Sequence, residues 1–421
     1  MAPFLVICLL LIGAKWAAQM GLDHLNQRHV RAHAGEVPPA FKDAITPETY
    51  AKSVDYTLAK SRFHRVEITW EAVVLIALLF SGVLPWFYGA FTRASGSSIW
   101  AGAAFLFLTG ILLTLLELPL AWCAQFRLEE RFGFNTTRQG TWWSDRLKGL
   151  LLGLVLGYPL LLLILKLVQA AGPAWWLWAW ACFVSFQLVM LLLAPVLILP
   201  LFNKFTPLPA GSLREQLLSL GERAGFRAQD IQVMDGSKRS RHSNAFFTGF
   251  GRFRKIVLFD TLIQQLTALE LESVLAHEIG HYKKKHIPKV LAWSMGGWLL
   301  AFYILSVLAR TPWFYGSFGF ATGNLFASGN IVPVFLLFTL LAGIVTFWIS
   351  PLAHQFSRRH EYEADAYAAF LMKEVRSLCG ALRKLNEKNL SNLTPHPLYS
   401  GFYYSHPTLL EREEALDRLQ R

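Results

Sequence analysis

Long apolar stretches alternate with polar segments along most of this chain. About 20 consecutive apolar residues in a helix are enough to cross the hydrocarbon core of a bilayer. The first such stretch is short and contains Lys15, so it either spans the membrane or serves as an uncleaved signal anchor. In all we expect about seven membrane-spanning helices, near residues 3–20, 68–90, 99–122, 148–169, 174–199, 291–309 and 331–352.

Two polar regions, at about 200–290 and 353–421, flank the last two predicted spans. The first of them contains an amphipathic pattern from Ser212 to Ala224, and Gly225 is a typical helix stop. Short runs with strand-like alternation follow it, and the last two of these are joined by a Gly-containing turn. We therefore expect a small β-sheet, with strands near 231–234, 243–249 and 255–259.

The segment after this sheet has clear helix signals. Thr267 and Glu270 have the spacing of a capping box, in which each side chain bonds to the backbone of the other residue. Pro288 is expected to mark the end of the helix. Apolar residues recur at helical spacing between these limits, at Leu271, Val274, Leu275 and Ile279.

This predicted helix carries the motif His277-Glu278-Ile279-Gly280-His281. Positions four apart lie on the same helix face, so His277 and His281 can point ring nitrogens at a single Zn²⁺. Glu278 lies about 100° around the helix from His277, where it can reach a metal-bound water without ligating the metal. That is the HExxH arrangement of zinc proteases. The alternative is a pair of buried histidines that happen to fall four apart.

A catalytic zinc site normally has three protein ligands, so a third must come from elsewhere. Candidates follow the last predicted span, in an Ala-rich segment that is expected to be helical to about Met372. Glu361 and Asp365 share a helix face, so one can ligate while the other orients a ligand histidine. Spacing alone leaves His360 and Glu363 open as ligands. The alternative for the whole segment is a solvated, charged helix face.

Composition and charge agree with a membrane protein that has a cytoplasmic catalytic part. The 421 residues are 54% apolar, with a mean hydropathy of +0.36 and a net charge of +12. Nearly all Lys and Arg lie in loops that share one side, and basic loops mark the cytoplasmic face. We therefore expect the HExxH helix to face the cytoplasm. The run Lys283-Lys284-Lys285 adjoins a span, so we expect it to contact anionic lipid headgroups, and we expect no nucleic-acid partner.

Taken together, the motifs resemble the zinc-dependent type I CAAX prenyl endopeptidases of the membrane. The HtpX heat-shock membrane proteases are more distant relatives, with fewer spans. The resemblance covers nearly the whole chain. Besides HExxH and Glu361–Asp365 it rests on residues 129–135, 200–208, 243–246, 256–262 and 404–412.

The resemblance implies roles for individual residues. Glu361 would be the third zinc ligand, and Asp365 would hold a zinc-bound histidine. His406 would stabilise the oxyanion, and the alternative from the sequence alone is a capping or surface histidine. A sheet edge suits proteolysis because an extended peptide can add to it through main-chain hydrogen bonds. The resemblance implies that the bound peptide is lined by Asn244, Ala245 and Phe246, and the alternative is that these strands are purely structural.

The expected fold class is mainly α. We expect a polytopic membrane protein with a gluzincin-like zinc protease domain that contains a small β-sheet, and the resemblance implies that its spans enclose a chamber. Residues 1–199 would form the N-terminal transmembrane region, and residues 200–421 the protease domain, interrupted by two spans. The resemblance also implies that one zinc ion lies at the cytoplasmic end of this chamber.

These observations predict an integral-membrane zinc endopeptidase with Glu278 as general base, acting on a peptide or protein substrate. The alternatives are a quality-control protease of HtpX-like role acting on non-prenylated proteins, and a non-enzymatic channel, carrier or degenerate scaffold. The chain lacks the long insertions of the eukaryotic enzymes and ends without an ER-retrieval signal. A bacterial inner membrane is therefore the expected location.

Overall fold

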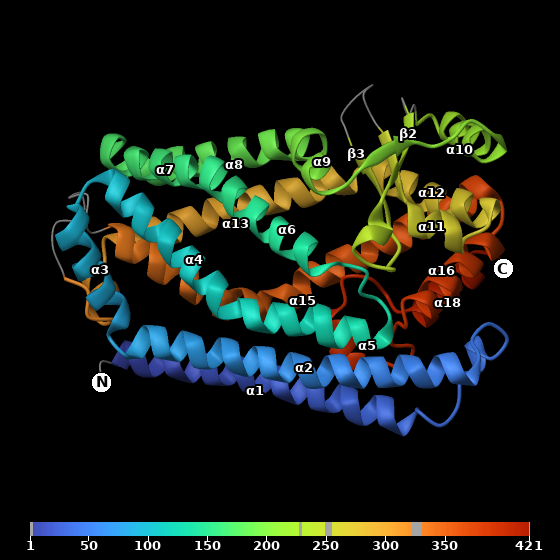
Figure 1. The fold of residues 1–421 in the computed structure, drawn as a ribbon, viewed down its shortest axis with the longest axis horizontal. Coiled ribbons are helices and arrows are strands. Elements are labelled where there is room, and N and C mark those ends of the chain that lie inside the picture. The colour runs from blue at the N-terminus through green and yellow to red at the C-terminus, as the bar shows by residue number, and fades with distance from the viewer. Residues whose placement is uncertain (1–2, 227–229, 249–254, 322–330, 421) are drawn as a thin grey trace.

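The computed structural model describes residues 3–226, 230–248, 255–321 and 331–420. Figure 1 shows long helices that run along the longest axis of the molecule, with the small sheet near one end. The helices of the first half are α1 (Pro3–Ala32), α2 (Pro47–Phe80), α3 (Val83–Ser95), α4 (Ile99–Cys123), α5 (Glu130–Phe132), α6 (Gln139–Leu152), α7 (Tyr158–Ala170), α8 (Trp175–Leu193) and α9 (Leu199–Phe202). The second half contains α10 (Ser212–Arg223), α11 (Asp260–Gln265), α12 (Ala268–Lys283), α13 (His286–Ala309), α14 (Pro312–Gly316), α15 (Ile331–Met372), α16 (Arg376–Lys388), α17 (Pro397–Tyr403) and α18 (Leu409–Gln420).

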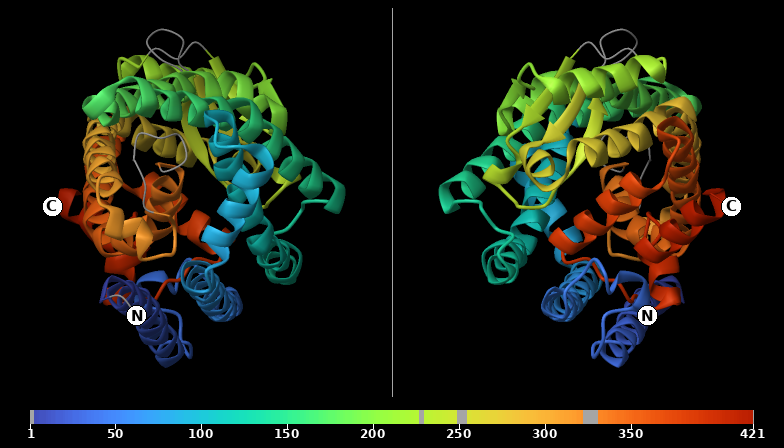
Figure 2. Two further views of the ribbon diagram at one scale, coloured as in Figure 1. Left: turned by 90° about the vertical axis from the view of Figure 1, so that its left-hand side faces the viewer. Right: turned by 90° about the vertical axis from the view of Figure 1, so that its right-hand side faces the viewer.

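The membrane region agrees with the predicted spans. Within the described residues, six helices are long and apolar enough to cross a membrane, and the pair α2 and α3, bent by 59°, brings the number to as many as seven. Only 6% to 44% of the most apolar window of each of the six helices is buried. Figure 2 shows the spans arranged as a ring when the molecule is viewed end-on. The prediction of a mainly α, polytopic protein is confirmed.

The last predicted span and the segment with the candidate third ligand form one helix. Helix α15 runs without a break for 42 residues, and Pro351 lies inside it without ending it. The carboxylates near the C-terminal end of α15 therefore lie on the same continuous helix as the last membrane span.

The predicted end of the HExxH helix is wrong. Helix α12 ends at Lys283, and Lys285 has a left-handed backbone conformation with φ of 56° before α13 begins at His286. Pro288 thus lies in the first turn of the following helix. Proline is tolerated there because the first N–H groups of a helix have no acceptor within the helix.

The sheet has four strands in the order β1-β2-β4-β3. The predicted strands appear as β2 (Asp230–Met234), β3 (Ala245–Thr248) and β4 (Lys255–Phe259), while β1 (Phe205–Pro207) was not predicted. β2 and β4 are parallel, and the other two pairs are antiparallel. The turn expected between β3 and β4 lies outside the described residues. β3 occupies one edge of the described sheet, on the side that leads towards α12.

Candidate active site

The helix that carries the HExxH motif is held at its start by the predicted capping box. The Glu270 N–H donates to Thr267 Oγ1, and the Thr267 N–H donates to the Glu270 carboxylate at 2.7 Å. Lys384 of α16 also donates to Glu270, at 2.8 Å. These contacts fix the rotation of α12, and this rotation turns its buried face towards α15.

The backbones of α12 and α15 touch at Gly280. A β-carbon at this position would lie 2.9 Å from Ala364 Cα and 3.0 Å from the Ala364 carbonyl oxygen. Such distances are far below van der Waals contact, so a glycine is required for this approach. The approach brings Glu361, one turn before Ala364, close to the two histidines of the motif.

His277, His281 and Glu361 form a compact group. One nitrogen or oxygen from each lies within 4.8 Å of the others. The two Nε2 atoms are 3.1 Å apart, and the Glu361 carboxylate oxygens lie 3.5 Å from His277 Nε2 and 3.4 Å from His281 Nε2. Two imidazole nitrogens and one carboxylate are the ligand set of a catalytic zinc site that keeps one position open. In the described part of the chain, no other group of His, Cys, Asp and Glu side chains has this arrangement.

Asp365 and Arg412 orient His277 through its Nδ1 side, opposite to the Nε2 atom that faces Glu361. Asp365 Oδ1 accepts a hydrogen bond from His277 Nδ1 at 2.8 Å. Arg412 of α18 donates to both carboxylate oxygens of Asp365, at 2.6 and 2.8 Å. A buried carboxylate that is fixed in this way holds the proton on Nδ1 and leaves the lone pair on Nε2, the atom that faces Glu361.

A second chain of hydrogen bonds orients His281. Its Nδ1 lies 2.9 Å from Nδ1 of the buried His286, whose Nε2 lies 3.1 Å from Glu363 Oε2. The His286 ring also stacks on His360, with 4.0 Å between ring centroids. Because Glu363 accepts from His286 Nε2–H, the other His286 nitrogen can accept from His281 Nδ1–H. His360 and Glu363 therefore contact His286, which supports His281, and are not themselves part of the metal-ligand group.

Two further predicted residues lie beside this group. Glu278 is half-buried on α12, and burial raises the pKa of its carboxyl group above the usual range. His406, in the loop between α17 and α18, has its Nε2 3.4 Å from Glu361 Oε1. Its side chain is 64% exposed, which leaves the ring free to contact a bound molecule.

The predicted substrate strand lies at the edge of the sheet. Asn244 directly precedes β3, and its carbonyl oxygen accepts from the Phe259 N–H at 3.1 Å. Ala245 and Phe246 pair with Leu258 and Val257 of β4. Pairing of β3 with a strand on its other side is not seen among the described residues, so that edge could accept an added peptide strand.

Sequence reasoning missed the supporting roles of Arg412 and His286. Arg412 falls inside the segment 404–412, but its contact with Asp365 joins residues that are 47 positions apart. His286 follows His281 by five positions across a break between two helices, so no helical periodicity relates them. The position of Arg412 in the segment that resembles the family's C-terminal histidine motif was a signal for a role near the site, but it did not identify Asp365 as the partner.

Comparison with known proteins agrees with this geometry. Residues 26–204 match the family model described as "CAAX prenyl protease N-terminal, five membrane helices", and residues 207–420 match that of peptidase family M48. CAAX prenyl protease 1 of Saccharomyces cerevisiae is 38% identical over 410 residues, which cover 91% of this chain and 88% of that protein. A homologue from Arabidopsis thaliana is 36% identical, with 90% of each chain covered.

A solved structure shows the same likeness in three dimensions. The crystal structure of S. mikatae Ste24p matches with a TM-score of 0.93 and 34% identity, over 99% of this chain and 100% of that one. The agreement covers the membrane helices as well as the HExxH helix and the sheet. The chain therefore belongs to peptidase family M48, in the branch with the CAAX prenyl protease N-terminal region, and is an integral-membrane metalloprotease.

Proposed function

We propose that this protein is a zinc endopeptidase that cleaves prenylated peptides or proteins close to their C-terminus. The observation that carries the proposal is the group of three ligand atoms, from His277, His281 and Glu361, that lie within 4.8 Å of one another. Glu278 lies on the same helix as the two histidines. The printed names of the relatives, CAAX prenyl protease, support the choice of substrate class. Residues 1–199 would act as the transmembrane region and residues 200–421 as the protease domain.

His277, His281 and Glu361 would hold one zinc ion. When bound there, zinc lowers the pKa of a water molecule towards about 7 and polarises the scissile carbonyl group. The chain's own groups supply the remaining steps. Asp365 with Arg412, and His286 with Glu363, keep both histidines in the tautomer that presents Nε2. Ligands held in this way need no reorientation when the metal binds.

Glu278 would act as the general base and then as the general acid. It takes a proton from the attacking water as the C–O bond forms, and passes this proton to the amine nitrogen as the C–N bond breaks. In the metal-free protein, burial raises the pKa of Glu278. His406 would donate a hydrogen bond to the carbonyl oxygen as negative charge develops on it.

Asn244, Ala245 and Phe246 would hold the substrate in an extended conformation. Main-chain hydrogen bonds to the free edge of β3 do not depend on side-chain identity, so they suit varied peptides. The basic loops lie on the same side of the membrane as α12, which supports a cytoplasmic catalytic domain. Location in a bacterial inner membrane stays a prediction, and the relatives named above are eukaryotic.

The test of this function compares a farnesylated peptide ending in a CAAX-type sequence with its unfarnesylated form. Each is incubated with purified, zinc-loaded protein, and the products are identified by mass spectrometry. Loss of the last three residues from the farnesylated peptide alone is the expected result. Equal cleavage of both peptides would instead favour a general membrane-protein protease with the same catalytic chemistry.

A further inference from the structure

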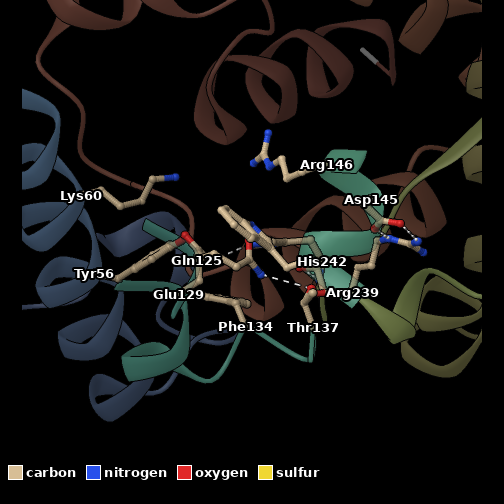
Figure 3. Close-up of a pocket in the computed structure, with 12 residues that line it drawn as sticks. Tyr56, Lys60, Gln125, Glu129, Phe134, Thr137, Asp145, Arg146, Arg239 and His242 are labelled. Atoms are coloured by element: carbon tan, nitrogen blue, oxygen red, sulfur yellow. Dashed lines mark hydrogen bonds and ion pairs between the residues drawn. The ribbon is translucent and has the colours of Figure 1, made fainter. Parts of the chain in front are cut away.

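A cavity of about 420 Å³ lies outside the metal-ligand group. Its walls come from helices α2 and α6, from the π-helical segment Ala124–Glu129 that continues α4, and from the loop that leads into β3 (Figure 3). Its surface combines aromatic rings with charged side chains. Neither the zinc chemistry nor the main-chain contacts proposed for β3 make use of it.

Two cations in this cavity form no ion pair with any described residue. Arg239 donates to both Asp145 oxygens, at 2.8 and 3.1 Å. Glu129 accepts from the Tyr56 hydroxyl at 2.7 Å, lies 3.5 Å from His242 Nε2 and interacts electrostatically with Lys60. The lining thus has three cationic side chains (Lys60, Arg146 and Arg239) against two carboxylates (Glu129 and Asp145), which leaves a net positive charge. The side chains of Lys60 and Arg146 are exposed, and Figure 3 draws no interaction at either. Each rests on a ring, Lys60 5.1 Å from the centre of Tyr56 and Arg146 4.8 Å from that of Trp142. A positive cavity with aromatic walls suits an anion that carries an apolar body.

The cavity lies just before the N-terminal end of the candidate substrate strand. His242 lines the cavity, and three residues further along the chain β3 begins at Ala245. His242 is held in place by stacking on Phe134 at 4.2 Å and by contact with Asn389 at 3.0 Å. A peptide that adds to β3 in the antiparallel direction would therefore run its C-terminal end towards this cavity.

The spacing also fits the proposed cleavage. Three residues in an extended strand cover about 10 Å, and Ala245 lies three positions after His242. A peptide whose reacting bond lies beside β3 would then place a carboxylate three residues later near His242. Lys60 and Arg146 line the same cavity as His242 and offer a point charge and a two-pronged donor, and both groups suit a carboxylate.

We propose that this cavity binds the free C-terminal carboxylate of the substrate, with Lys60 and Arg146 as its charged partners. The inference rests on the proposed function and deepens it. Binding of the chain end would fix the direction of the peptide along β3. It would also set the cleavage position by its distance from the C-terminus, so that the protease would prefer peptide ends to internal segments.

The first test measures binding without turnover, in the zinc-loaded Glu278→Gln protein. The probe is a fluorescent farnesylated CAAX-type peptide with either a free C-terminal carboxylate or a C-terminal amide, and the readout is anisotropy. Loss of a charged hydrogen-bonded contact corresponds to roughly a tenfold change in Kd, so the acid is expected to bind about that much more tightly than the amide. Adding Lys60→Met with Arg146→Met should weaken acid binding to the level of the amide and leave amide binding unchanged.

Arg138→Met provides the matched control, because Arg138 is an exposed cation next to α6 that does not line the cavity. It should keep the preference for the acid. Equal binding of acid and amide by the Glu278→Gln protein would overturn the proposal, as would a preference that survives the double substitution. A third outcome combines equal binding of acid and amide with an anionic phospholipid that native mass spectrometry detects on the Glu278→Gln protein but not on the doubly substituted one. In that case the cavity is a lipid site and the proposal is wrong.

A kinetic comparison separates this proposal from the proposed function. With active protein, kcat/KM for the acid should exceed that for the amide by the same factor, and the double substitution should abolish this ratio. If neither peptide is cleaved but the binding preference and its loss are observed, the cavity assignment stands and the proposed reaction fails. If both peptides are cleaved at equal rates, the reaction stands and the cavity assignment fails.

Discussion

Gly280→Ala tests whether the close contact of α12 and α15 builds the metal site. The added β-carbon would lie 2.9 Å from Ala364 Cα, 3.0 Å from the Ala364 carbonyl oxygen and 3.2 Å from Tyr367 Cβ. Carbon atoms in contact normally lie about 3.5 to 4.0 Å apart. Two of the three obstacles are backbone atoms, so the helices must separate by roughly 0.6 Å to restore contact.

The site should be affected more strongly than the fold. Overpacking costs about 1 to 3 kcal/mol, and alanine recovers about 1 kcal/mol of helix propensity, so the free energy of unfolding should fall only modestly. Ligands of the metal, however, lie on both sides of this contact, His277 and His281 on α12 and Glu361 on α15. Metal–ligand distances tolerate only about 0.2 Å of error. We therefore expect zinc affinity to fall roughly 10- to 100-fold, as it does when the support of a ligand is lost.

The assay is a competition for zinc between the detergent-solubilised protein and a chromogenic chelator. Thermal melting measures stability in parallel. Gly297→Ala in α13 is the control, because a β-carbon there meets no described atom within 4 Å. It should leave zinc affinity unchanged. Wild-type zinc affinity in Gly280→Ala would refute the argument that this contact positions the ligands.

Three further predictions concern the residues around the ligands. Arg412→Lys keeps the charge but loses the two-pronged contact with Asp365, so zinc affinity should fall roughly 10-fold. Unchanged zinc affinity in the chelator competition would show that the contact of Arg412 with Asp365 does not orient His277. Glu363→Gln removes the anionic acceptor of His286, so it should also weaken zinc binding. It should shift the visible absorption of a cobalt-substituted protein as well. An unaltered cobalt spectrum would show that Glu363 is only a surface charge. Burial raises the pKa of Glu278, so the folded metal-free protein binds this proton more tightly than the unfolded chain does. The resulting destabilisation is absent below the unfolded pKa of about 4.3 and grows as pH rises towards the folded pKa. In melting curves of the metal-free protein, Glu278→Gln should therefore raise Tm at pH 7 but not near pH 4, and an equal effect at both values would contradict the assignment.

The sequence was sufficient for features that depend on local pattern. The capping box at Thr267 and the i, i+4 spacing of His277 and His281 are properties of a single helix, so spacing predicts them directly. The apolar runs likewise predict spans, because the bilayer sets a minimum length. Strands β2 and β4 were visible as short β-branched runs between turn residues.

Features that depend on packing between distant segments were not predictable in the same way. Nothing in the sequence shows that α12 and α15 touch at Gly280, and this contact brings Glu361 to the histidines. Pro288 lies at the start of α13 rather than at the end of α12, and the sequence does not distinguish the two because proline both follows helices and occupies their first turn. Strand β1 has only three residues and includes Pro207, so it has too few positions to show alternation.

The roles of zinc and Glu278 are tested together by measuring zinc content and peptide cleavage in the same preparations of wild type and Glu278→Gln. Metal content is determined by plasma mass spectrometry, and cleavage of the farnesylated peptide by product analysis. We expect roughly one zinc per chain in both proteins, with cleavage by the wild type alone. Near-normal cleavage by Glu278→Gln, or a wild type that cleaves without bound metal, would contradict a mechanism in which Glu278 activates a zinc-bound water.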